Sequence, residues 1–279
     1  MLLRTQEYIL PEKRPQFAVA NLGSIDDVLL TTPLLDSIRK AHPTSRITYI
    51  VARGAAQVLD YSPFINELII WPAERSNRRS GMQMLRKMGR RRFDASVVFT
   101  PNTYLNAIFW LGRTPKRIQT RDLNSAAREL GVQPPDGVQL QYTVTPTERA
   151  AALATLARWN IDPEKEKVLA IHPGSWPVES YLEVTRQAAD LGNCKVVILG
   201  DSEERPLASQ LATNPSAKLV DLTSRMSFRE QVAVLAQTHL LLHSSSLTGH
   251  LAAAIGLRVV STSDPNIKTA ADVIAKLNG

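Results

Sequence analysis

The sequence contains a single cysteine, Cys194, among 279 residues. One thiol forms no internal disulfide and no cysteine zinc site, which is typical of proteins of the reducing cytoplasm. No apolar run approaches the roughly 18 residues that a membrane span requires. Residues 1–16 lack the basic start, apolar core and cleavage site of a secretory signal. These absences predict a cytoplasmic protein.

Several nucleotide and hydrolase motifs are also missing. The dinucleotide fingerprint G-x-G-x-x-G would need glycines where Ile25 and Val28 stand, and there is no Walker phosphate loop. The chain has no G-x-S-x-G elbow for a serine hydrolase. The five histidines predict no metal site. The sequence therefore lacks the usual motifs of NAD-dependent enzymes, ATP hydrolases and serine hydrolases.

The first half of the chain has too few acidic residues to balance its basic ones. Residues 1–150 hold 21 Lys and Arg against 13 Asp and Glu, whereas residues 151–279 hold 12 against 13. Between residues 75 and 92 there is no acid at all. The predicted basic patch comprises Arg78, Arg79, Arg86, Lys87, Arg90, Arg91 and Arg92.

Such a patch attracts an anionic partner, either a phosphorylated substrate, a membrane surface or a nucleic acid. An ordinary solvated basic loop is the alternative interpretation. Aromatic residues make up 6% of the chain and only Phe93 borders the basic run, so no base-stacking platform is visible. We therefore expect no nucleic acid partner.

The remaining composition is that of a globular protein, with 44% hydrophobic and 21% charged residues. Short β-branched runs alternate with longer amphipathic stretches, which indicates βαβ units around parallel sheets. Expected strands are 17–22, 46–52, 67–72, 95–100 and 113–120, then 167–174, 195–200, 218–223, 240–245 and 258–263. Expected helices are 28–41, 54–59 and 80–90, then 147–159, 178–191, 203–212, 227–239, 248–256 and 268–277.

The length and the restart of this pattern predict two domains. We expect an α/β fold in which two Rossmann-like domains with parallel sheets, residues 1–148 and residues 149–279, face each other across a cleft. The last helix belongs to the second domain, with packing against the first as an open alternative. Ligands of open parallel sheets bind beyond the carboxyl ends of the strands.

The first candidate site follows the first expected strand and contains Gly23, Ser24, Asp26 and Asp27. Gly23 permits a tight exit from the strand. An aspartate at the start of a helix is commonly a cap. The same carboxylate, at the carboxyl end of a strand, can instead accept a proton from a substrate hydroxyl.

The second and third candidate sites suit a phosphate. Gly174 and Ser175 follow a strand and offer backbone N–H groups and a hydroxyl. An ordinary turn explains these two residues equally well. We expect His172 to have a structural rather than a catalytic role. The third site leads into a helix whose start offers free N–H groups. Its residues are Ser244, Ser245, Ser246, Thr248, Gly249 and His250.

Four segments together resemble the family nine glycosyltransferases, the heptosyltransferases of lipopolysaccharide core synthesis. They are NLGSIDDVLLTTP and its continuation to residue 72, residues 93–120, AIHPGSWP (170–177) and SSSLTGHLAAAIGLRVV (244–260). The resemblance implies a GT-B-like fold, in which the domain of residues 1–148, with its basic patch, lies on the acceptor side and the domain of residues 149–279 binds the nucleotide-sugar. It also implies inverting transfer, without a metal or other cofactor, from an ADP-heptose-like nucleotide-sugar. The implied acceptor is an anionic, lipid-linked glycan, and contact with the inner membrane follows from it. Asp27 stands where the family has its presumed catalytic base.

The sequence departs from that family in its donor half. Asp26 replaces a glycine, the lysine that follows Ser-Trp-Pro is missing, and Ser244–Leu247 replaces an Asn-Asp-Ser/Thr-Gly motif. Two hypotheses remain from different classes: an inverting glycosyltransferase with Asp27 as its base, and a glycosyltransferase-like binding or scaffold protein that has lost turnover. A sugar epimerase on a Rossmann sheet is a third.

Overall fold

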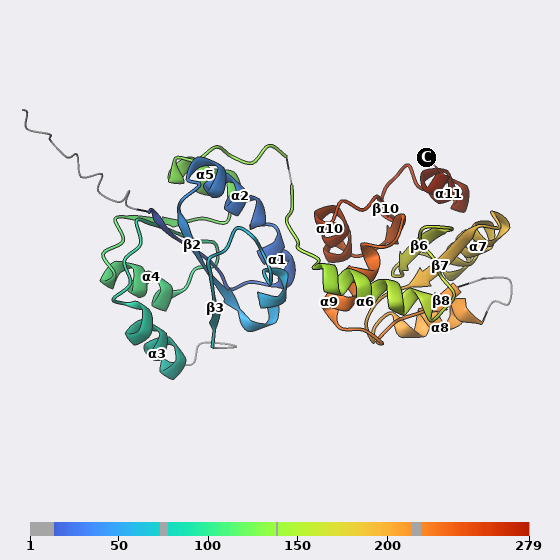
Figure 1. Cartoon of the computed structure of the whole chain (residues 1–279), viewed down its shortest axis with the longest axis horizontal. Helices are drawn as coiled ribbons and strands as arrows, with labels where there is room; N and C mark the ends of the chain where they lie inside the picture. The colour runs from blue at the N-terminus through green and yellow to red at the C-terminus, as the bar shows by residue number, and fades with distance from the viewer. Residues whose placement is uncertain (1–13, 73–77, 138, 214–218, 279) are drawn as a thin grey trace, which may run out of the picture. The chain divides into compact units, whose positions relative to one another are not determined.

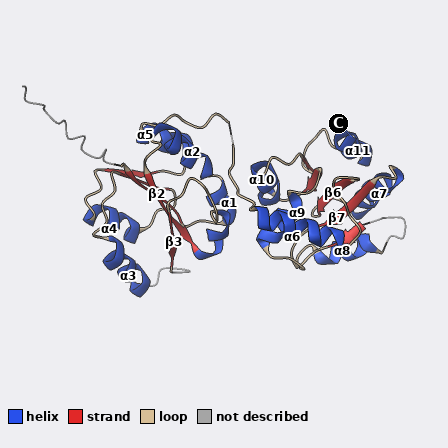
Figure 2. Ribbon diagram, viewed as in Figure 1, coloured by secondary structure: helices blue, strands red, loops and turns tan. Residues whose placement is uncertain are grey.

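The computed structural model describes residues 14–72, 78–137, 139–213 and 219–278. Its strands form two parallel sheets of five strands each, flanked by helices (Figures 1 and 2). The chain divides into two compact units. The first comprises the described residues up to Leu22 with Leu34–Arg53 and Pro63–Pro135; the second comprises Gly23–Pro33, Gly54–Ser62 and the described residues from Asp136. The expected α/β class with two parallel sheets is confirmed.

The first sheet contains β1 (Gln16–Asn21), β2 (Arg46–Ala52), β3 (Glu67–Trp71), β4 (Ala95–Val98) and β5 (Lys116–Gln119). All neighbouring strands are parallel, in the order β3-β2-β1-β4-β5. The helices are α2 (Thr32–Ala41), α3 (Arg78–Met88), α4 (Thr103–Leu111) and α5 (Leu123–Leu130). The strand order reverses between β1 and β4, which is where Rossmann-type sheets bind their ligands.

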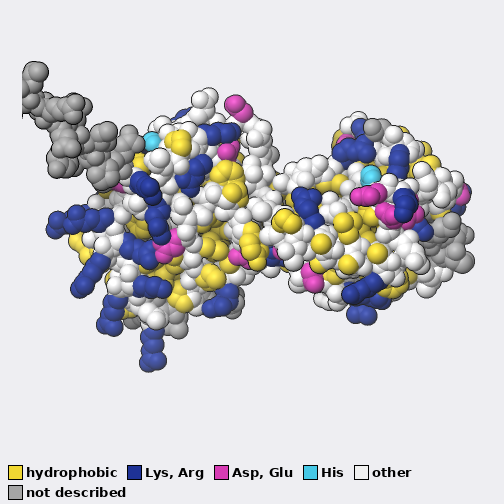
Figure 3. Space-filling model, in the orientation of Figure 1, with side chains coloured by type: hydrophobic (Ala, Val, Ile, Leu, Met, Phe, Trp, Pro, Cys, Tyr) yellow, Lys and Arg dark blue, Asp and Glu magenta, His cyan; other side chains and the backbone are white. Residues whose placement is uncertain are grey.

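One face of this sheet is covered by α3 and α4. Met84 and Met88 of α3 and Ile108 of α4 pack with Ala20 of β1 and Ile50 of β2. Lys and Arg side chains project from the part of the unit that carries these two helices (Figure 3). The surface of α3 and α4 that faces solvent is therefore strongly positive.

The second sheet repeats the same winding, in the order β10-β9-β6-β7-β8. Its strands are β6 (Lys167–His172), β7 (Cys194–Ile198), β8 (Leu219–Asp221), β9 (Leu240–His243) and β10 (Val259–Ser261). Its helices are α6 (Pro146–Ala157), α7 (Val178–Asp190), α8 (Arg205–Ala212), α9 (Phe228–Leu235), α10 (Ser246–Ala254) and α11 (Ala270–Asn278). Here the order reverses between β6 and β9.

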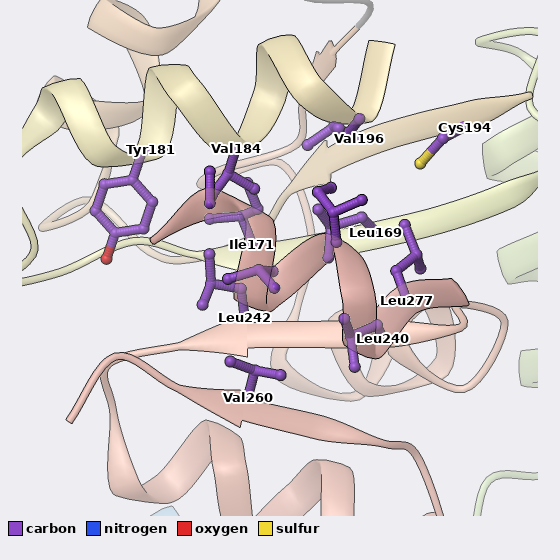
Figure 4. Packing of buried hydrophobic residues seen from close by; sticks show 14 of the residues in the cluster. Leu169, Ile171, Tyr181, Val184, Cys194, Val196, Leu240, Leu242, Val260 and Leu277 are labelled. Atoms are coloured by element: carbon purple, nitrogen blue, oxygen red, sulfur yellow. The ribbon is translucent and has the colours of Figure 1, made fainter. Parts of the chain in front are cut away.

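Alternate residues of these strands serve two separate cores, because successive side chains of a strand point to opposite faces. Leu169 and Ile171 of β6 pack against α7, α8 and α11, as Figure 4 shows for their cluster. Val168 and Ala170 pack on the other face, against α6, α9 and α10. The last helix, α11, packs in the core of the second unit, where Leu277 is buried.

Two short segments from early in the chain belong to the second unit: α1 (Ile25–Leu29) and most of the 3-10 helix η1 (Arg53–Val58). Arg229 of α9 holds η1 there, because its guanidinium donates to the carbonyl of Gln57 at 2.8 Å and to that of Thr143 at 2.8 Å. The same group pairs with Glu148 at 2.6 Å, which lowers the pKa of that carboxyl to about 2. One partly buried cation thus links α9 to three separate segments of the chain.

Several expected boundaries were wrong. The single helix expected at 28–41 is two helices, α1 and α2, separated at Leu30 and Thr31. Two helices, α4 and α5, were not expected at all. The expected strand at 218–223 begins outside the described residues, and β8 occupies only Leu219–Asp221 of it. Among the described helices, none has the length and apolarity to cross a bilayer.

Candidate functional site

A cavity of about 540 Å³ lies at the carboxyl ends of β6 and β9, at the point where the second sheet reverses its strand order. Four of the residues predicted from the sequence line it: Gly174, Ser244, Ser245 and Thr248. Ser175, Ser246, Gly249 and His250 do not. The second and third candidate sites therefore meet at one place, through the two loops that leave adjacent strands.

Gly174 is required where these loops touch. A Cβ atom at this position would overlap the Ser244 hydroxyl, so only glycine permits the approach. The N–H of Gly174 donates to the Tyr181 hydroxyl at 3.0 Å. Burial raises the pKa of Tyr181, which keeps that hydroxyl neutral. The loop after β6 is therefore held rigidly against the loop after β9.

The helix α10 starts at this cavity. It begins at Ser246, two residues earlier than the sequence suggested, so Thr248 and Gly249 lie in its first turn and His250 lies beyond it. Its N-cap residue, Ser245, makes no side-chain capping bond. The carbonyl of Ser245 instead accepts from Nδ1 of His243 at 2.8 Å. The first N–H groups of α10 are left for other partners at the cavity wall, where the helix dipole favours an anion.

The charged side chains of the cavity were not foreseen from the sequence. Asp201, Glu203 and Glu204 line it, and among the described lining residues none is Lys or Arg. His172 also lines it, and burial lowers the pKa of its imidazole. Nδ1 of His172 is buried and has no hydrogen-bond partner among the described residues. The cavity thus combines an uncapped helix start with carboxylates and a neutral imidazole.

The first candidate site lies on α1, where each of the two adjacent aspartates has a defined partner. Asp27 forms a capping box: its Oδ2 accepts from the backbone N–H of Ser24 at 2.8 Å and from the Ser24 hydroxyl at 2.7 Å. The capping interpretation of the sequence is therefore correct for Asp27, and its side chain is exposed. Gly23 precedes the cap and is partly exposed.

Asp26 instead pairs with His250 of α10, within the second unit. The distance from its Oδ1 to Nδ1 of the imidazole is 2.7 Å, and the two side chains are 29% and 37% exposed. This pair brings together residues of the first and third candidate sites. The resemblance gave no expectation for it, because the related family has glycine where Asp26 stands.

The basic patch lies on α3 and the turn that follows it, in the first unit. Arg79, Arg86, Lys87, Arg90 and Arg92 are exposed. Arg91 is not free: it pairs with Glu67 of β3 at 2.7 Å, which lowers the pKa of that carboxyl. Arg78 begins α3, and Arg75, which also belongs to the basic run, lies outside the described residues.

The sequence carried a signal for the acidic residues of the cavity, and a histidine spacing outside the cavity also invites interpretation. Residues 200–204, Gly-Asp-Ser-Glu-Glu, directly follow a strand, which is the place where ligand contacts arise in such sheets. His239 and His243 are four positions apart, a spacing that suits a metal on a helix. Here the pair spans β9, so the two residues are about 13 Å apart along extended chain. Among the described residues no group of three or more His, Cys, Asp or Glu side chains is placed to hold a metal ion.

Two parallel sheets of Rossmann order, with a ligand-sized cavity at the switch point of the second, define a GT-B-like α/β protein. The sequence profile of glycosyltransferase family 9 (heptosyltransferase) matches residues 117–265, more than half of the chain. The chain belongs to this family.

Solved structures agree on the fold. A glycosyltransferase family 9 protein from Veillonella parvula is similar with a TM-score of 0.76 and 21% identity, over 88% of this chain and 80% of that one. Heptosyltransferase II of E. coli is similar with a TM-score of 0.70 and 17% identity, over 94% of this chain and 97% of that one. The E. coli heptosyltransferase WaaC, solved with ADP, is similar with a TM-score of 0.66 and 19% identity, over 94% of this chain and 97% of that one. No curated protein gives a significant match.

Proposed function

We propose that this protein is an inverting, metal-independent glycosyltransferase that moves a heptose-like sugar from a nucleotide-diphosphate donor to an anionic, lipid-linked glycan. Family membership supports sugar transfer. The observation that carries the proposal is the cavity at the switch point of the second sheet, with the uncapped start of α10 on its wall. The nucleotide-sugar is a substrate, and no cofactor is part of the proposal.

In this proposal the donor diphosphate binds at the start of α10. The N–H groups of the first turn and the hydroxyls of Ser244 and Ser245 donate to its oxygens, and the helix dipole supplies positive charge that a metal ion would otherwise bring. Asp201, Glu203 and Glu204 suit a different part of the donor, because carboxylates accept from the hydroxyls of a ribose or sugar.

Asp27 is the proposed general base. The acceptor hydroxyl oxygen attacks the anomeric carbon, its proton passes to the Asp27 carboxylate, and a new glycosidic bond forms. The bond from the anomeric carbon to the diphosphate oxygen breaks, and its electron pair leaves with the diphosphate. Attack opposite to the leaving group inverts the configuration. The Ser24 hydroxyl donates to Oδ2 of Asp27 and so fixes the orientation of the carboxylate.

The acceptor is proposed to be anionic because the first unit carries the excess positive charge. Exposed Arg86, Lys87, Arg90 and Arg92 on and after α3 attract phosphate or carboxylate groups of a glycan. A lipid-linked acceptor places the working protein at the inner face of a membrane, so we propose a cytoplasmic, membrane-peripheral enzyme.

The test is the variant Asp27→Asn, assayed for transfer and for donor binding. We expect its transfer rate to fall by about 10²–10⁴-fold, the usual contribution of a general base, while calorimetry finds the donor affinity unchanged. Asp190→Asn, which removes an exposed carboxylate on α7, is the matched control and should keep full activity. Full activity of Asp27→Asn would show that Asp27 is a cap and not the base.

The second candidate is a glycosyltransferase-like binding protein without turnover. Two observations favour it: the charged side chains among the described lining residues of the cavity are all acidic, and the Asp27 carboxylate is already engaged in a capping box. Calorimetric titration with ADP-, UDP- and GDP-sugars separates the two candidates. Binding of one class with measurable transfer supports the enzyme, and absence of binding to all three supports the second candidate.

A further inference from the structure

One corner of the first unit, far in sequence from the candidate donor cavity, combines exposed apolar side chains with cations. It lies where α4 ends and β5 begins, and we call it the α4–β5 corner. Trp110 is 66% exposed and Leu111 is 47% exposed. The corner consists of Trp110, Leu111, Arg113, Lys116 and Arg117, of which the three cations are exposed and none makes a salt bridge with a described residue.

The end of α3 adds further charge beside it. A Cβ atom on Gly112, the C-cap of α4, would overlap the carbonyl of Arg91, and one on Gly89 would lie 3.7 Å from Cδ1 of Leu111. The ends of α3 and α4 are therefore packed together. Arg90 and Arg92, both exposed, are consequently neighbours of the corner. Figure 3 shows Lys and Arg side chains gathered over the part of the unit where Figure 1 labels α3 and α4.

The surface is hollowed on both sides of Trp110 and Arg117. Two adjacent cavities, of about 530 and 550 Å³, share these two residues. The first is lined by the apolar side chains of Val98, Phe109 and Ile118. It also reaches Ser96, which is 1% exposed and whose hydroxyl has no hydrogen-bond partner among the described residues. A buried polar atom without a partner indicates that a ligand group or solvent completes this hollow.

We propose that the α4–β5 corner docks this protein on an anionic lipid bilayer. Trp110 and Leu111 enter the headgroup region, where an amphipathic ring and an aliphatic side chain are both stable, and the surrounding arginines and lysine meet the lipid phosphates. Charge complementarity selects this occupant, because the corner has cations around an apolar centre. A nucleic acid fits less well, since one tryptophan and one leucine make no stacking platform. The proposal deepens the proposed function, which rests on a lipid-linked acceptor.

Cosedimentation with vesicles tests the proposal, using the full chain without donor or acceptor. The vesicles are phosphatidylcholine alone or phosphatidylcholine mixed with phosphatidylglycerol. We expect binding to the mixed vesicles, weakened by added salt, and much weaker binding to the neutral ones. Arg113→Gln/Lys116→Gln should lower the partition coefficient about 30-fold, because each such charge contributes about 1 kcal/mol. Trp110→Ala should lower it about tenfold.

Matched controls change the second unit in the same way. Arg158→Gln/Arg205→Gln removes two exposed cations, and Trp159→Ala removes a tryptophan that is 44% exposed. Both should bind as the original protein does. Equal binding by corner and control variants, equal binding to neutral vesicles, or binding of an oligonucleotide in place of vesicles would each overturn the proposal. The assay includes no sugar transfer, so the two proposals can fail separately. A protein that binds the vesicles but transfers no sugar would refute the proposed function and support the docking surface.

Discussion

Two neighbouring carboxylates on α1 have different partners, and this separates their roles. Asp27 accepts from Ser24 in a capping box, whereas Asp26 pairs with the imidazole of His250 at 2.7 Å. A carboxylate on one ring nitrogen fixes the orientation of a histidine and the position of its proton. We infer that Asp26 orients His250 at α10, the helix to which the proposed function assigns the leaving diphosphate.

A double-mutant cycle on Asp26 and His250 tests this coupling. Asp26→Asn should lower kcat/KM for the donor about tenfold, the effect of losing one charge-assisted hydrogen bond. His250→Gln should lower it at least as much. The double variant should be no worse than His250→Gln alone, because two residues that act as a unit have non-additive effects. Losses that simply add would show that the two side chains act independently.

At the scale of elements, the loops after β6 and β9 function only if they approach closely. Gly174→Ala would push its new Cβ into Ser244, so we expect a loss of stability of about 1–3 kcal/mol and weaker donor binding. Adding Ser244→Gly should restore the stability, since it removes the side chain that collides. Gly54→Ala is the control, because nothing lies within 4 Å of the Cβ position there. Denaturant unfolding measures all four proteins. An unchanged unfolding midpoint for Gly174→Ala alone would contradict the close packing.

The strands and most helices could be predicted because their hydrophobic pattern is local. α4 escaped prediction since TYLNAIFWL is apolar nearly all round and lacks a polar face. α5 had readable ends, Asp122 as its N-cap and Gly131 in the left-handed conformation after it, but its eight residues are too few for a clear period. The break between α1 and α2 follows from Pro33, which sits in the first turn of a new helix more easily than inside an old one.

The candidate site was harder to predict than the fold, because its contacts join distant residues. The loops of Gly174 and Ser244 could be placed at one edge of the sheet because each follows a strand, and the carboxyl ends of parallel strands lie at the same edge. The pair of Asp26 and His250 joins positions 224 apart in the chain, and no local pattern indicates it. The acids of the cavity depend on how the loop after β7 turns at Gly200, whose φ of 148° is a glycine conformation.

At the scale of the whole molecule, buried histidines couple folding to pH. His243 is 7% exposed, and burial lowers its pKa and that of His172 below the ordinary value near 6.5. Both imidazoles are therefore neutral in the folded protein, whereas the unfolded chain takes up their protons once the pH falls below about 6.5. Protons thus favour unfolding: this stability is fully present above pH 6.5 and is lost as the pH falls through and below that value.

We expect the free energy of unfolding to decrease from pH 7 to pH 5, with each buried histidine adding a slope of at most about 1.4 kcal/mol per pH unit. His243→Gln should reduce the slope, because an amide can still donate to the Ser245 carbonyl but takes up no proton on unfolding. Denaturant unfolding at several pH values measures both proteins. A flat profile for the original chain, or an unchanged slope in the variant, would mean that the imidazole of His243 is not held neutral by the fold.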